Sequence, residues 1–125
     1  MDQAAIEDLF AAAPEIAPIR TRGMFGGHGV YAGEAMFGLV AYGELYLKVD
    51  DETRPAFEAA GARPFVYEAK GARSVMSYWT LPDAAQDDPD EAARFGRLAL
   101  AAARRALAAR RPRKAPKPRR TGVSP

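Results

Sequence analysis

The spacing of apolar residues predicts a helix at the start of the chain, over residues 2–13. Its apolar residues recur at intervals of three and four and so share one face: Ile6, Leu9, Phe10 and Ala13. Asp2 is placed to cap the first turn, and Pro14 is expected to stop the helix.

Between residues 19 and 50 the pattern changes to short apolar and aromatic runs separated by glycines, which is typical of strands joined by tight turns. We expect strands near 19–25, 28–32, 35–42 and 45–50. The first two are compatible with one bent strand carrying a bulge at Gly26-Gly27. In the last run, alternate residues should point to opposite sides of the sheet, with Tyr46 and Lys48 on the polar side of a half-buried antiparallel strand.

The second half of the chain predicts a short helix over 51–60, a hairpin of strands 64–69 and 73–81, and a long final helix. Asp88 and Pro89 are a typical helix start, and Pro112 ends the pattern. The predicted order is α-β-β-β-α-β-β-α. Sequential strands with short turns indicate an α+β fold with an antiparallel sheet.

Composition narrows the class of protein. The 125 residues include no cysteine and one histidine, which excludes disulfides, thiolate metal sites and multi-histidine metal sites. No signal peptide and no bilayer-spanning run are expected, so we predict a cytoplasmic protein without a membrane partner. We expect one folded domain over 1–110 and a basic, proline-rich, disordered tail over 111–125.

Charge is divided unevenly along the chain. All 16 acidic residues lie at or before Glu91, whereas 11 of the 18 lysines and arginines follow position 93. Such a basic end is a candidate arm for non-specific nucleic-acid binding. Its candidate residues are Arg110, Arg111, Arg113, Lys114, Lys117, Arg119 and Arg120. The alternatives are a solubilising tail and a tail that folds back on the acidic domain.

The glycine-rich segment at 26–29 invites comparison with a phosphate-binding loop. It lacks the Gly-Lys-Ser/Thr ending, and no helical pattern follows it, so we interpret it as a turn. His28 has no second ligand for a metal, and the acidic run 50–52 is better explained by helix capping. We predict no catalytic residue, no metal and no cofactor.

Segments in a fixed order resemble the N-terminal domain of the TfoX/Sxy family over about residues 3–108. They are RGMFGGHGVY at 22–31, MFGLV at 36–40, LYLKVD at 45–50, TRPAFEAAGARPF at 53–65 and MSYWTLPDA at 76–84. The resemblance implies a secretion-chaperone-like α+β architecture, a non-enzymatic regulatory role linked to competence and transcription, and often a dimer. Six residues in these segments look least like core: Arg22, Gly26, Gly27, His28, Lys48 and Tyr78.

These observations leave two functional hypotheses. The first is a bacterial regulatory module whose domain binds a protein partner or itself, with nucleic-acid affinity in the tail. The alternative is a protein-interaction or chaperone-like dimeric module with no nucleic-acid role. A small enzyme would require His28, Arg22 and a carboxylate to meet in one pocket.

Overall fold

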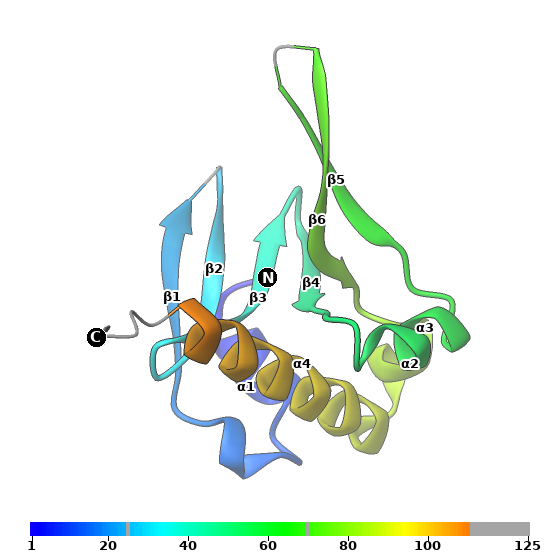
Figure 1. Ribbon diagram of the computed structural model, residues 1–125. Helices are drawn as coiled ribbons and strands as arrows, with labels where there is room; N and C mark the ends of the chain where they lie inside the picture. The colour runs from blue at the N-terminus through cyan, green and yellow to red at the C-terminus, as the bar shows by residue number, and fades with distance from the viewer. Residues whose placement is uncertain (25, 70, 111–125) are drawn as a thin grey trace, which may run out of the picture.

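Six antiparallel strands form one sheet in the order β1-β2-β3-β4-β6-β5 (Figure 1). The computed structural model describes residues 1–24, 26–69 and 71–110. The strands are β1 Ile19–Met24, β2 Gly27–Ala32, β3 Ala35–Ala41, β4 Glu44–Lys48, β5 Pro64–Ala69 and β6 Ala72–Thr80. The helices are α1 Gln3–Leu9, the 3-10 helix η1 Pro14–Ile16, α2 Arg54–Ala59, α3 Asp83–Asp87 and α4 Pro89–Arg110.

The α+β class and the antiparallel sheet are confirmed, and the predicted element order is roughly consistent, with four strands instead of three before α2. Residues 19–32 are not one bent strand: β1 and β2 are separate and pair from Ile19 opposite Ala32 to Met24 opposite Gly27. Gly26 lies in the turn between them with φ 74°. The irregularity expected at Gly26-Gly27 lies instead on the β2–β3 side, between Val30 and Tyr31.

The helix starts agree with the predicted capping residues, whereas the end of the first helix differs from the prediction. The Asp2 carboxylate accepts a bond from the Ala5 N–H at 2.9 Å, and Asp88 accepts one from the Asp90 N–H at 2.9 Å. α1 ends at Leu9, well before the predicted stop at Pro14, which instead begins the short η1 helix. The short helix α3 was not predicted.

The second helix begins at Arg54, later than predicted, because the Asp50 side chain holds the residues before it in a turn. Its carboxylate accepts bonds from the N–H groups of Glu52 and Thr53 at 3.1 and 3.2 Å, which hold residues 50–53 in a turn. The same carboxylate receives the Arg105 guanidinium at 2.7 and 3.0 Å. This pair ties α4 to the segment that follows β4.

The main core lies between one sheet face and helices α1 and α4. Phe10 meets Phe37 edge-on at 5.8 Å, and Phe57 meets Phe95 at 5.0 Å. Gly96 allows the close approach of α4, because a Cβ there would lie 2.8 Å from the Phe10 ring. The helices gather beside the lower part of the sheet, and the β5–β6 hairpin projects beyond the other strands (Figure 1).

Candidate partner-binding face

A second apolar cluster lies on the other face of the sheet. Leu39 pairs with Tyr46, whereas their neighbours Val40 and Leu45 belong to the main core. Because consecutive strand residues point to opposite faces, the Leu39–Tyr46 cluster faces away from that core. We call this surface the methionine face. It is made only of strand residues: Met24, Met36, Leu39, Ala41, Tyr46, Phe65, Met76 and Tyr78.

The methionine face corrects the prediction that β4 is polar on its second side. Tyr46 is 8% exposed, and its ring lies 4.8 Å from that of Phe65. Its hydroxyl donates to Glu44 at 3.1 Å, and burial raises the pKa of Tyr46. Beside this pair, Tyr42 is 84% exposed, with its ring 6.1 Å from Phe65. The sheet is therefore apolar on both faces, and the second face reaches solvent.

Lys48 and Tyr78 form a polar network at one edge of the methionine face. The Lys48 ammonium donates to the Ser77 hydroxyl at 2.6 Å and lies 5.1 Å from the Tyr78 ring centroid. The Tyr78 hydroxyl donates to the Met36 carbonyl at 3.2 Å. Burial raises the pKa of Tyr78 to about 12, and burial, followed by the nearby Arg110 charge, lowers the pKa of Lys48.

A cleft of about 260 Å³ opens beside this network, where the C-terminal part of α4 passes the sheet. Its walls come from the strands, the β2–β3 turn and the helix: Tyr31, Glu34, Met36, Lys48, Tyr78, Ala103, Ala106, Leu107 and Arg110. The cleft therefore brings together residues that are far apart in the sequence.

Two arginines extend this positive region along β1. The guanidinium carbons of Arg20 and Arg22 lie 5.2 and 5.9 Å from the Tyr31 ring centroid, which is within cation–π range. Arg20 also donates to the Gly33 carbonyl at 2.8 Å. Pairing across the strands places Arg22, Gly29, Leu39 and Tyr46 in one row, so Arg22 belongs to the methionine face.

The structure divides the predicted site residues into groups. Arg22, Lys48, Tyr78 and Arg110 lie around Tyr31 or line the cleft. Gly26 and Gly27 instead shape the β1–β2 turn and the approach to β3. The other tail candidates lie outside the described residues: Arg111, Arg113, Lys114, Lys117, Arg119 and Arg120.

His28 does not join the cleft. It pairs in register with Val40, a main-core residue, and its Nε2 is buried with no hydrogen-bond partner in the described part of the chain. That nitrogen therefore has no bonded carboxylate that could orient it as a base.

Sequence reasoning missed the methionines and Arg20. A signal was present, because the run AMFGLVA at 35–41 is almost continuously apolar, as expected for a strand buried on both sides. The run indicates a strand with two apolar faces, but strict alternation would place Met36 and Leu39 on opposite faces. They share the methionine face because β3 has one extra residue between the pairs Tyr31–Met36 and Val30–Gly38, an irregularity that the sequence pattern does not reveal.

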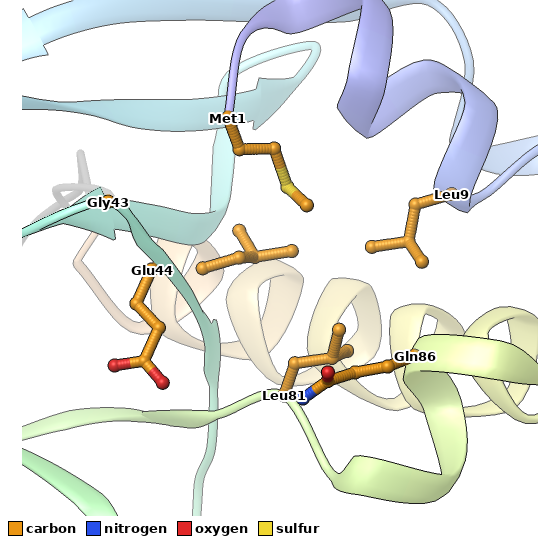
Figure 2. Close-up of a pocket in the computed structure, with 7 residues that line it drawn as sticks. Met1, Leu9, Gly43, Glu44, Leu81 and Gln86 are labelled. Atoms are coloured by element: carbon orange, nitrogen blue, oxygen red, sulfur yellow. The ribbon is translucent and has the colours of Figure 1, made fainter.

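A separate hollow of about 340 Å³ lies near α1 and α3 and shares no lining residue with the methionine face (Figure 2). Met1, Leu9 and Leu81 point into it, and Glu44 and Gln86 stand at its border. Glu44 carries the only acidic side chain among its lining residues in the described part of the chain.

Neither a metal site nor a membrane span emerges from residues 1–24, 26–69 and 71–110. In these ranges no three His, Cys, Asp or Glu side chains are arranged to hold a metal ion. None of the helices there has both the length and the apolar composition needed to cross a bilayer.

The fold and these sequence segments define a known class of domain. Residues 8–103 match the model of the TfoX N-terminal domain, and the chain belongs to that family. It is 29% identical over 83 residues to the DNA transformation protein TfoX1 of Aliivibrio fischeri (strain ATCC 700601 / ES114). The match covers 66% of this chain and 40% of that relative, so the chain spans less than half the length of the relative.

Proposed function

We propose that this protein is a cytoplasmic regulatory module of the TfoX type that acts by binding a protein partner through the methionine face. The observation that carries this proposal is the apolar cluster on the second face of the sheet. All of its members are strand residues, and none comes from a described helix. Apolar patches rimmed by polar groups mark interaction sites on soluble proteins. The relative is named for DNA transformation, which supports a role connected with competence.

The second part of the proposal assigns non-specific nucleic-acid affinity to the tail. Residues 1–93 carry a net charge of −9, which opposes a phosphate backbone, whereas residues 94–125 carry +11. Lysines and arginines that neutralise phosphates release counterions, so binding through the tail should weaken steeply with salt.

Fluorescence anisotropy of labelled duplex DNA tests the tail. The full chain and a 1–110 variant are compared across a salt series. The hydrogen bonds and ion pairs described above all lie within residues 1–110, so the shortened chain retains them. We expect the full chain to bind with a steep salt slope and the 1–110 variant to bind much more weakly. Equal binding by both chains would remove the tail from the proposal.

A second candidate is a dimeric protein-interaction or chaperone-like module without nucleic-acid affinity. The projecting β5–β6 hairpin (Figure 1) favours it, because Val75, which pairs with Val66 in this hairpin, is 66% exposed. Val75→Asp should then lower the dimer fraction in sedimentation equilibrium. If the protein is a monomer at all concentrations and binds DNA in a salt-sensitive way, the dimeric module is excluded and the first proposal stands.

A further inference from the structure

We propose that the methionine face binds an apolar protein segment flanked by acidic side chains. This inference rests on the proposed partner-binding role and names the chemistry of the partner. It combines two parts of the face. The floor is the apolar cluster of the methionine face, and the rim is the set of cations around it: Arg20, Arg22, Lys48 and Arg110.

The floor suits an irregular apolar ligand. Met24, Met36 and Met76 are only partly buried, and all three pack against the cluster formed by Leu39, Tyr46 and their neighbours. Methionine is unbranched and polarisable, so a surface containing several of them adapts to side chains of different shape. The fourth methionine, Met1, lies in the separate hollow of Figure 2.

The rim supplies positive charge that is not already paired. In the described part of the chain, Arg20, Arg22, Lys48 and Arg110 form no ion pair with a carboxylate. Elsewhere the arginines are commonly paired, as in the contacts of Arg97 with Glu15 and of Arg105 with Asp50. Four of the six described lysines and arginines without an ion pair therefore lie around one face, and the other two are Arg63 and Arg104.

Their contacts hold these cations beside the floor. Tyr31 lies under both rim arginines, and Lys48 is held between Ser77 and the Tyr78 ring. Carboxylates flanking an apolar segment would meet these groups, and such charge complementarity governs association rate and partner choice. A nucleic-acid strand fits less well, because its charged backbone would leave the methionines without apolar partners.

The test follows methionine methyl signals by NMR in the full chain. The probe is a short amphipathic helical peptide with leucines on one face and glutamates on the other. A matched peptide carries lysine in place of each glutamate. With the acidic peptide, we expect the methyl signals of Met24, Met36 and Met76 to shift and that of Met1 to stay, which makes Met1 an internal control.

Variants of the rim test the charge contribution. Arg22→Glu reverses an exposed charge on the face, and we expect it to weaken binding of the acidic peptide roughly tenfold. Lys48→Gln should also weaken binding of the acidic peptide. Arg104→Glu is the matched control, because Arg104 is exposed on α4 but does not line the cleft. It should leave the affinity within about twofold of the original.

Several results would overturn the inference. They are no shift of the three methionines, a shift confined to Met1, equal binding of the lysine peptide, and equal weakening by Arg104→Glu and Arg22→Glu. Methionine shifts that depend on protein concentration without peptide would assign the face to a second copy instead. The DNA-binding experiment tests the tail, and the NMR experiment tests the methionine face. Either proposal can therefore fail while the other stands.

Discussion

Replacing Gly27 by alanine tests why the paired glycines are present. A Cβ at Gly27 would lie 1.8 Å from the carbonyl oxygen of Val40 and 2.9 Å from its carbonyl carbon. Carbon–oxygen contacts between strands normally fall near 3.3 Å, so β2 and β3 would have to separate by about 1.5 Å locally. The obstacle is backbone, which cannot rotate away as a side chain can.

The size of the effect follows from the contacts that this separation disrupts. Two weakened ladder hydrogen bonds cost about 1 kcal/mol each, and forcing an extra carbon into a packed site adds about 1–3 kcal/mol. We therefore expect Gly27→Ala to lower the free energy of unfolding by about 3–5 kcal/mol. That is a large share of the roughly 5–15 kcal/mol typical of such domains.

Gly26→Ala is the matched control. Gly26 has φ 74°, but a Cβ there would meet nothing within 4 Å. The expected loss is about 1 kcal/mol, from the left-handed backbone alone. Urea unfolding followed by far-ultraviolet circular dichroism measures both variants. Loss of cooperative unfolding in Gly27→Ala alone agrees with the reasoning, whereas equal stability of the two variants would refute it.

Other predictions concern the core and two ionisable groups. Gly96→Ala should destabilise the protein by about 1–2 kcal/mol in the same unfolding assay, because overlap with the Phe10 ring outweighs the better helix propensity of alanine; a gain in stability would contradict the packing described. Asp50→Ala should lose about 1–2 kcal/mol at neutral pH through the lost turn and Arg105 bonds. The hydrogen bond from Arg105 lowers the pKa of Asp50, so its contribution is present above the unfolded value near 4 and is lost as pH falls through the folded pKa; a difference between Asp50→Ala and the original that does not shrink in acid would contradict this. Tyr78→Phe should remove an ultraviolet titration step near pH 12, and an unchanged titration curve would show that Tyr78 is not the buried phenol.

Much of the local structure could be predicted from the sequence because it depends on neighbouring residues. Asp2 and Asp88 cap helices by bonding N–H groups two or three positions ahead, and this signal is visible in the letters themselves. Glycine turns likewise marked the β3–β4 hairpin at Gly43, which has φ 77°.

The relations that build the candidate site depend on contacts between distant residues. Arg105 reaches Asp50 across 55 positions, and the Tyr78 hydroxyl reaches the Met36 carbonyl across 42. The first contact depends on how α4 packs beside the end of β4, and the second on the pairing of β4 with β6, which brings Tyr78 near β3. No local pattern specifies which hairpin joins which strand. Lys48 and Tyr78 could be singled out from the sequence, but their meeting on one sheet face could not be predicted.

The most direct test of the central claim is a transcript profile of cells that encode this protein. The gene is deleted and then restored as the original sequence, as the methionine-face variant Arg22→Glu with Met76→Glu, or as the control Arg104→Glu. The regulatory account predicts that deletion changes a set of transcripts, and that the original and the control restore them while the face variant, present at equal level, does not. Restoration by the face variant, or no transcript change on deletion, would contradict it.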